Sequence, residues 1–341
     1  MNNFEVLAER AGIVFMGMDA AQIQYQSREI IAEMGLDAQS LPQTTPNSGI
    51  LSMFTTYIDP KLIDVLVTPM RAVEVVGNEI KLGDWVTETA AFPVIESTGF
   101  TAAYGDFNTN GRAKANANWP QRQSFHYQTM TEWGERELER MGKGRIDWAN
   151  RMNIASALTL NKYQNKTYFF GVAGLQNYGL LNDPALPASI GPTTGAAGNT
   201  WDKKTSLEIL ADFKALYQDL QGRAKGLVEL DTPMRLGLSP LREVFLTNTT
   251  DFNVTVLDRL KKMFPNLSIE VAPEYTTGSG ELMQLFPLEL EGQRTVDVAF
   301  TEKMRAHPLI VAESSFRQKK SQGTWGAVVF RPFLVSSMLG F

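Results

Sequence analysis

The sequence predicts an α+β fold, and three features of the chain lead to this prediction. A single long helix is predicted between Asp147 and Gly171. An extended segment with few aliphatic residues precedes it, at residues 84–132. Helix-like and strand-like patterns then alternate from residue 174 to about residue 310. Both kinds of element therefore contribute large parts of the expected structure.

The composition is that of a protein that buries a core, because 43% of the 341 residues are hydrophobic and 20% are charged. Lys and Arg number 32 and Asp and Glu number 37, so the net charge is −5. A broad nucleic-acid-binding surface usually requires a basic excess, so the composition argues against that function. The only dense basic run, RQKK at 317–320, is predicted to be a solvated loop.

Cysteine is absent, and His126 and His307 are the only histidines. Disulfides, thiolate metal sites and cysteine nucleophiles are therefore excluded, and we expect both histidines to be packing residues. We predict no catalytic residue, no metal site and no cofactor. The N-terminus has acidic residues where a signal peptide has basic ones, and no run approaches the ~20 apolar residues that cross a bilayer. We therefore expect a soluble protein that is made in a cytoplasm and has no membrane partner.

The first part of the chain is predicted to be an arm. Residues 1–56 begin with a helix that has Ile23, Ile30 and Ile31 at helical spacing, and they end in the extended stretch LPQTTPNSGI. Residues 54–70 predict a short helix that starts at Pro60 and stops before Pro69.

Residues 84–132 are rich in Thr, Ala, Asn and aromatic residues, and Asn110-Gly111 lies between two extended-looking stretches. That dipeptide favours a β-hairpin. A hairpin with so little aliphatic content cannot bury enough surface to be stable alone, so it needs a partner surface. A mobile loop is the alternative interpretation of this segment.

Two helices are predicted next. TEWGERELERM forms a short one that is broken by Gly142 and Gly144. The long one has Asp147 as N-cap and Gly171 as C-terminal stop, so about 24 residues form a rod of roughly 36 Å. The apolar face expected for it consists of Trp148, Met152, Ile154, Ala155 and Leu158.

The region after residue 174 is predicted to be mixed. Thr205 and Glu208 form a capping box at the head of a helix that ends at Gly222. Its inward side chains are expected to be Leu207, Leu210, Phe213, Leu216, Tyr217 and Leu220. Strands are expected at 234–239, 267–273 and 281–290, and helices after Ser239-Pro240 and at 253–264. A long apolar strand interrupted by Pro332 is expected at 323–341.

No catalytic motif is present. The glycine-rich stretches at 171–174 and 195–200 match neither phosphate-binding pattern and are predicted to be turns. No nucleophile elbow, zinc-protease helix or calcium loop occurs. Carboxylates are plentiful, so an acid-pair hydrolase with a large lid stays open as an alternative, and its acids would be Asp297 with Glu302 or Glu281 with Glu289.

Two passages carry a resemblance to a known family: FFGVAGLQNYGLLNDPAL at 169–186 and WGAVVFRPFLVSSMLGF at 325–341. Together with the order of arm, hairpin, long helix and mixed body, they resemble the major capsid proteins of tailed double-stranded DNA bacteriophages, which have the Hong Kong 97-type fold. The hairpin matches by position and composition only.

The resemblance implies a division of the chain into parts. These are an N-terminal arm (1–56), a first part of the P-domain (57–83), an extended E-loop hairpin (84–132), the P-domain spine helix (133–173), an α/β A-domain (174–310) and a closing P-domain strand (311–341).

The resemblance also implies two sets of site residues. The candidates for contact between subunits are the hairpin aromatics Phe92, Phe100, Tyr104, Phe107 and Trp119. The candidates for the corner between the spine helix and the A-domain are Gly171, Gly174, Gly179, Asn182, Asp183 and Pro184.

The implied function is a structural subunit that assembles with itself into pentamers and hexamers of an icosahedral phage head. The head would form in the host cytoplasm and enclose double-stranded DNA without binding it specifically. We expect a separate scaffolding protein, because few residues precede the body, and also a portal and a decoration protein. Some members of the family form Lys–Asn crosslinks between the hairpin and the C-terminal part of the P-domain. We expect none in that arrangement here, because Lys114 lies just after the hairpin turn but no asparagine follows Asn266. An encapsulin-type compartment shell with the same fold is the related alternative.

Overall fold

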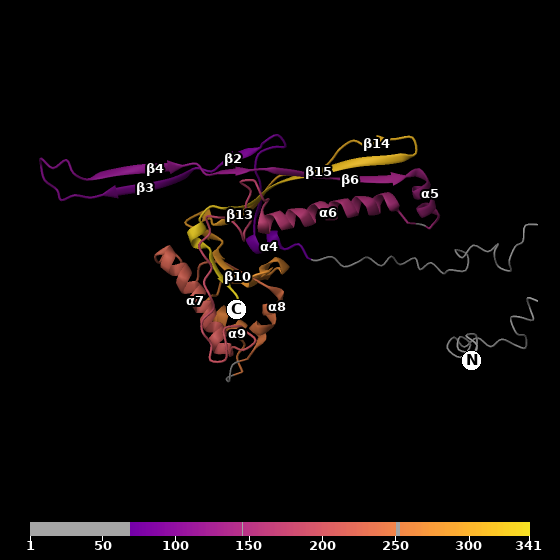
Figure 1. The fold of residues 1–341 in the computed structure, drawn as a ribbon. Coiled ribbons are helices and arrows are strands. Elements are labelled where there is room, and N and C mark those ends of the chain that lie inside the picture. The colour runs from indigo at the N-terminus through magenta and orange to yellow at the C-terminus, as the bar shows by residue number, and fades with distance from the viewer. Residues whose placement is uncertain (1–68, 145, 250–252) are drawn as a thin grey trace, which may run out of the picture. The chain divides into compact units, whose positions relative to one another are not determined.

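A computed structural model describes residues 69–144, 146–249 and 253–341 (Figure 1). The chain divides into two units, residues 1–64 and 65–341, and the described residues all belong to the second. The expected arm at 1–56 and the expected short helix after Pro60 lie outside the described residues. Helix α4 (Ala72–Val76) is the first described element.

One sheet is organised around the long strand β15 (Ser315–Val329). β6 (Phe125–Gly134) pairs antiparallel with β15 over ten residue positions. β13 (Val296–Ala306) and β14 (Ile310–Val311) also pair antiparallel with β15, and β1 (Glu79–Lys81) is parallel to β13. Helices α5 (Glu135–Lys143) and α6 (Trp148–Phe170) pack against this sheet: α5 contacts β6, and α6 contacts both β6 and β15.

A second sheet has the strand order β16-β10-β7-β8. Its strands are β7 (Met234–Leu238), β8 (Leu267–Val271), β10 (Gly280–Pro287) and β16 (Ser336–Leu339), and β9 (Thr276–Thr277) pairs with the start of β10. Helices α7 (Ser206–Ala224), α8 (Pro240–Glu243) and α9 (Val256–Met263) belong to this part of the chain. Further short elements are η1 (Val244–Thr247), η2 (Pro273–Tyr275), η3 (Pro332–Leu334), β11 (Glu289–Leu290) and β12 (Gln293–Arg294).

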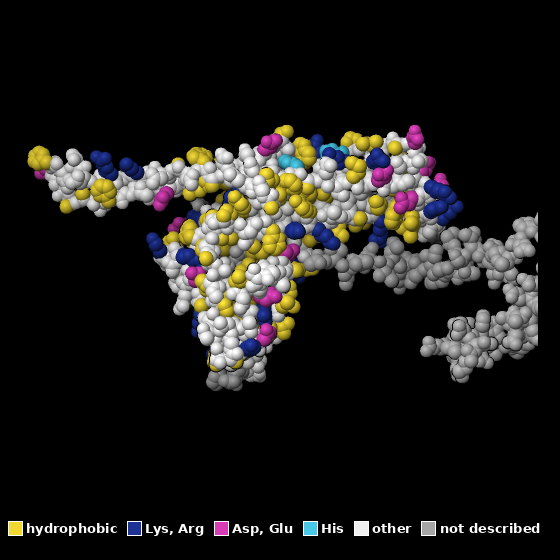
Figure 2. Space-filling model, in the orientation of Figure 1, with side chains coloured by type: hydrophobic (Ala, Val, Ile, Leu, Met, Phe, Trp, Pro, Cys, Tyr) yellow, Lys and Arg dark blue, Asp and Glu magenta, His cyan; other side chains and the backbone are white. Residues whose placement is uncertain are grey.

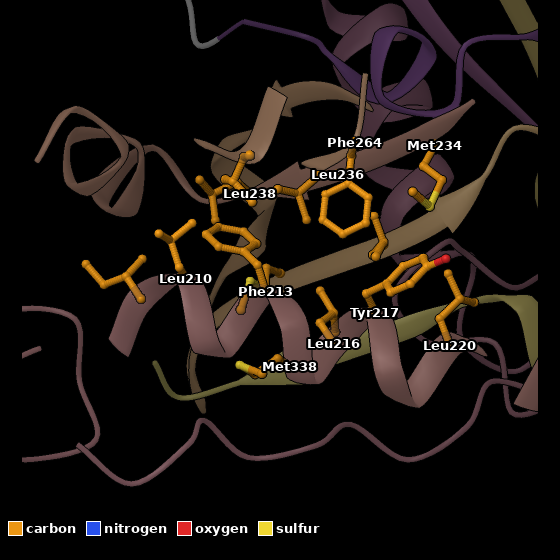
Figure 3. Close-up of a cluster of buried hydrophobic side chains, with 14 of the residues drawn as sticks. Leu210, Phe213, Leu216, Tyr217, Leu220, Met234, Leu236, Leu238, Phe264 and Met338 are labelled. Carbon is orange, nitrogen blue, oxygen red and sulfur yellow. The ribbon is translucent and has the colours of Figure 1, made fainter. Parts of the chain in front are cut away.

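Helix α7 packs on the second sheet through a continuous apolar stripe, which Figure 3 shows facing β7 and Met338 of β16. The predicted capping box is present, because Thr205 Oγ1 accepts from the Glu208 N–H while Glu208 accepts from the Thr205 N–H. Five of the six expected inward side chains are buried, but Leu207 is 56% exposed. The helix also runs through Gly222 and ends where Lys225 takes a left-handed conformation.

The closing stretch of the chain divides between the two sheets. The strand expected at 323–341 is interrupted at Pro332, as predicted, by η3. The segment before the interruption belongs to β15, whereas β16 after it pairs with β10 of the other sheet. β13 lies in the range 174–310 that was assigned to the A-domain, yet it pairs with β15. The borders between the two sheets therefore differ from the domain ranges that the resemblance implies. Those domain ranges stay a prediction.

Helix α6 begins and ends where the sequence predicts. The Asp147 side chain accepts from the Asn150 N–H, and Gly171 follows the last residue with a positive φ of 61°. Its expected apolar face is only partly correct, because Trp148, Met152 and Leu158 are half-buried. Ile154, in contrast, is 52% exposed, and Ala155 is also exposed. The residues that α6 buries are largely polar: Ser156, Leu160, Gln164, Asn165, Thr167, Tyr168 and Phe169.

The polar face of α6 is explained by β15, whose inward residues are also polar. Lys320 is 4% exposed, and its Nζ donates to Asn153 Oδ1 at 2.7 Å and to Ser156 Oγ at 2.6 Å. Gln322 Nε2 donates to Gln164 Oε1 at 2.5 Å. RQKK at 317–320 is thus part of a strand and not the solvated loop that we expected. Burial lowers the pKa of Lys320 below its usual range.

The short helix predicted at TEWGERELERM starts later and ends later than expected. Residues 131–134 belong to β6, and α5 begins at Glu135 and continues through Gly142. Thr131 and Trp133 are buried where β6 pairs with β15. This pairing makes residues 131–134 a strand, although the charged residues that follow them form a helix.

Candidate assembly surfaces

The predicted hairpin is present and has no core of its own. β3 (Val94–Phe100) pairs with β4 (Arg112–Asn118) over seven residue positions, and every residue of both strands is exposed (Figures 1 and 2). No other described strand pairs with them. At the hairpin root, β2 (Thr89–Ala91) pairs with β5 (Gln121–Gln123). Such a ribbon is marginal by itself in water, so its solvent-facing surface is the first candidate for contact with another subunit.

The hairpin tip, residues 101–111, is a loop that presents aromatic side chains to solvent. Tyr104 is 94% exposed and Phe107 is 99% exposed. The Asn108 amide donates to the Ala103 carbonyl at 2.7 Å, and the Asn108 N–H donates to the Gly105 carbonyl at 2.9 Å. Asn110-Gly111 lies at the end of this loop and not at its centre, and Gly111 has a φ of +94° where the chain enters β4.

The five aromatic contact candidates do not share one environment. Phe100 is 64% exposed and Trp119 is 58% exposed, so both resemble the tip residues. Phe92 differs, because it is half-buried and packs edge-to-face on Phe330 with ring centroids 5.8 Å apart. Its ring anchors the hairpin root to the chain's own core.

A groove of about 690 Å³ lies between the hairpin root and the end of β15. Apolar side chains form most of its wall: Phe92, Val94, Ile95, Val329, Phe330 and Phe333. Arg122, Arg294 and Arg331 also line it. Sequence reasoning missed this groove, because segments more than two hundred residues apart form it and no local pattern links them.

The junction at 171–184 is held by close backbone approaches at two glycines. A Cβ on Gly171 would lie 2.3 Å from the Asn177 carbonyl oxygen, and a Cβ on Gly179 would lie 2.2 Å from the Phe169 carbonyl carbon. Gly174 has a φ of +85°, but its Cβ would meet no atom within 4 Å. Close packing therefore requires glycine at Gly179, backbone conformation favours it at Gly174, and both reasons apply at Gly171, whose φ is +61°.

The polar corner candidates tie the junction to the spine helix and to the hairpin root. Asn182 Oδ1 accepts from the Gly179 N–H at 2.7 Å, and its amide donates to the Phe170 carbonyl at 2.5 Å. Asp183 is fully buried and accepts from Arg122 of β5 at 2.5 Å. The Arg122 guanidinium also lies 4.7 Å from the centroid of the Tyr178 ring. Pro184 follows Asp183 and lines a neighbouring pocket of about 450 Å³.

Both histidines contact Trp85, in the loop that leads from β1 to the hairpin root. The ring centroids of Trp85 and His126 are 4.7 Å apart, and those of Trp85 and His307 are 6.2 Å apart. His126 Nε2 lies 3.2 Å from Thr301 Oγ1. These contacts agree with the expected packing role of His126 and His307. No pattern in the sequence predicts that both histidines contact the same tryptophan.

His126 is expected to make the protein less stable in mild acid. Burial lowers the pKa of His126 below 6.5, against the opposing effects of Glu302 and Glu88. The Arg305 guanidinium over Trp85 is a further positive charge nearby. Because the unfolded chain binds this proton at a higher pH than the folded chain, stability is complete above about pH 6.5 and is lost as the pH falls through the folded-state pKa.

The measurement is the urea midpoint at about pH 7.5 and about pH 5.5, for the native chain and for His126→Gln. The variant should lose less stability on acidification than the native chain. Equal losses in the two proteins would show that His126 does not contribute to the pH dependence.

The described residues contain no group of three or more histidine and carboxylate side chains that could hold a metal ion. Among them, no helix combines the length and the hydropathy that crossing a membrane requires. Of the acids considered for a hydrolase, Asp297 is paired with Arg294 at 2.5 Å and Glu302 with Arg305 at 3.7 Å. These carboxylates serve ion pairs within the chain.

The model of one protein family, described as Pa193 gp26 major capsid protein, matches residues 41–340 of the sequence. This chain belongs to that major capsid protein family. It is a structural subunit of a bacteriophage capsid shell and not an enzyme. No curated protein matches this capsid protein chain by sequence.

Solved structures show that the fold is the Hong Kong 97-like capsid fold that the resemblance implied. The capsid of Myoviridae phage XM1 is 14% identical and has a TM-score of 0.72, and the match covers 87% of this chain and 100% of that one. A chain of Microbacterium phage Oxtober96 is 10% identical with a TM-score of 0.58, over 85% of this chain and 97% of that one. At these identities the likeness concerns the fold alone.

Proposed function

We propose that this capsid protein assembles into pentamers and hexamers of an icosahedral phage head that encloses double-stranded DNA. The observation that carries the proposal is the exposed hairpin, which buries little against its own chain although it presents several aromatic side chains. A stable interface buries roughly 800 Å² on each partner, and an extended hairpin supplies such area without a larger core. Aromatic residues are enriched in the buried centres of such interfaces.

Negative-stain microscopy after size exclusion tests this function. The chain would be purified alone and after expression with its neighbouring gene products. Rings or closed shells of uniform diameter support the proposal. A monomer or dimer at every concentration, with and without the neighbouring products, would contradict it.

Phe100, Tyr104, Phe107 and Trp119 are proposed as contacts between subunits. We expect the double variant Tyr104→Ala/Phe107→Ala to keep its stability within about 0.5 kcal/mol, because exposed side chains contribute little to folding. Assembly should be lost, since aromatic anchors contribute a large part of the binding energy of an interface. Urea unfolding and particle yield are the two measurements. Val86→Ala, at a residue that is 83% exposed outside the tip, is the matched control and should assemble normally. A normal particle yield from the double variant would contradict the assignment.

The residues at 171–184 are proposed as the corner between the spine helix and the A-domain. The close packing at Gly171 and Gly179 supports this assignment, and so do the bonds of Asn182 and Asp183 to elements on both sides. The domain borders follow from the same proposal.

Further partners are also proposed on general grounds. The net charge of −5 favours a container that does not bind its DNA specifically. A separate scaffolding protein, a portal and a decoration protein would complete the head, which would assemble in the host cytoplasm.

We expect cohesion without covalent bonds between subunits. Lys114 is an exposed hairpin lysine, but no asparagine follows Asn266 to serve as its partner. Purified particles boiled in SDS should therefore run as a single band of the monomer mass. A ladder of bands would show that a crosslink forms in some other arrangement.

A further inference from the structure

We propose that the groove at the hairpin root receives the hairpin tip of a neighbouring copy, with Phe107 inside the groove and Asp106 beside Arg331. This inference rests on the proposed shell function and names the surface that the exposed tip contacts.

The tip presents two aromatic side chains, Tyr104 and Phe107, and a single negative charge. Asp106 is the only charged residue in 101–111. Its carboxylate accepts from the Tyr104 hydroxyl at 3.0 Å, and no cation lies within ion-pair distance of it in the described part of the chain. The hydrogen bonds of Asn108 hold the loop in this shape before any contact is made, which lowers the entropic cost of binding.

The groove has the complementary chemistry. Most of its wall is apolar, and its volume of about 690 Å³ accommodates an aromatic side chain. Two of its arginines are already neutralised, since Arg122 is paired with Asp183 and Arg294 with Asp297. Arg331 donates only to the Leu290 carbonyl and to Gln293 Oε1, and no described carboxylate pairs with it. Its remaining N–H groups are available to an incoming carboxylate.

The occupant must come from another copy, because the tip cannot reach the groove of its own chain. Val94 lines the groove, and Phe100 ends the same strand just before the tip. Six residue steps of extended strand separate the two by roughly 20 Å. A tip that enters another copy's groove makes a head-to-tail contact between different surfaces, and contacts of this type form rings when the rotation between successive copies closes. Pentamers and hexamers are such rings.

Chemical crosslinking tests the contact directly, since the chain has no cysteine. Thr109→Cys places a thiol on the tip without removing Phe107, and Phe333→Cys places one in the groove, at a residue that is 44% exposed. Particles of the double variant would be treated with a short bis-maleimide. We expect a ladder of crosslinked chains in a denaturing gel.

Controls separate this contact from chance reaction. Each single-cysteine variant can form at most dimers. Thr109→Cys with Leu241→Cys, a residue of α8 that is 65% exposed, should give no ladder. Shells of normal diameter without the tip–groove ladder would overturn this inference and leave the proposed function standing. Failure of the native chain to form any particle would overturn both.

Charge reversal is a second test, and it does not depend on added thiols. Asp106→Arg and Arg331→Asp should each lower particle yield about tenfold, because like charges then face each other across the contact. The double reversal should restore most of the yield. A double variant that assembles no better than the single ones would overturn the pairing of tip and groove, as would single variants that assemble normally.

Discussion

Asp212→Ala is expected to lower the free energy of unfolding by about 3–5 kcal/mol, because it leaves a buried lysine without its counter-ion. The side chains of Asp212 and Lys204 are both fully buried, and Lys204 Nζ lies 2.6 Å and 2.8 Å from the two carboxylate oxygens. Without the carboxylate, only the Thr193 hydroxyl, at 3.5 Å, remains near the ammonium group. Urea unfolding of the unassembled chain, followed by tryptophan fluorescence, measures the loss.

Lys204→Met is the matched control, and it should cost less than Asp212→Ala. In that variant the buried carboxylate keeps donors from Trp201 Nε1 at 2.9 Å and from the Thr193 N–H and hydroxyl at 2.8 Å and 2.6 Å. Hydrogen bonds to a charged group contribute about 1.5–3 kcal/mol each, so three of them compensate much of the burial. Equal losses for the two variants, or a larger loss for Lys204→Met, would contradict this account. The network matters for the second sheet because it ties the stretch before α7 to that helix.

Gly179→Ala is expected to cost about 4 kcal/mol or more, at the upper end of the range for single substitutions. The added Cβ would lie 2.2 Å from both the carbonyl carbon and the oxygen of Phe169. These are backbone atoms at the end of the spine helix, and the Phe169 carbonyl also accepts from the Leu181 N–H at 3.0 Å. Relief of this overlap requires the backbone at Gly179 or at Phe169 to shift, because the atoms that a Cβ would meet belong to the main chain. Thermal unfolding and the yield of folded chain are the measurements.

Gly174→Ala is the matched control within the same junction. Its φ of +85° makes alanine strained by about 1–2 kcal/mol, but a Cβ there meets no atom within 4 Å. Gly179→Ala should therefore be several-fold more damaging than Gly174→Ala. Similar effects at the two positions would show that backbone conformation, and not close packing, governs the junction.

Local chemistry was sufficient to predict most helices and strands. Asp147 and Gly171 mark the ends of α6, and the capping box of Thr205 and Glu208 marks the start of α7. These signals are readable because a helix end needs a side-chain acceptor or a permissive backbone within a few residues. The order of the elements and the two quoted passages were also sufficient for the resemblance to capsid proteins, which the family match confirms.

The borders of α5 and the buried face of α6 could not be predicted in this way. A hydrophobic pattern would place Ile154 inside, but the polar side chains of β15 require hydrogen-bonding partners, and Asn153 and Ser156 supply them to Lys320. The choice between these two faces depends on a strand that lies more than 150 residues further along the chain. Local periodicity contains no information about that partner.

The sequence by itself therefore determined most element types, their order and the family, since caps, turns and periodicity act over short distances. Tertiary structure alone decided which sheet each strand joins, where both histidines meet Trp85, and that the hairpin root and the end of β15 enclose a groove. Each of these features joins residues that lie far apart in the chain. Their juxtaposition depends on how the elements pack, and packing is a property of the whole fold.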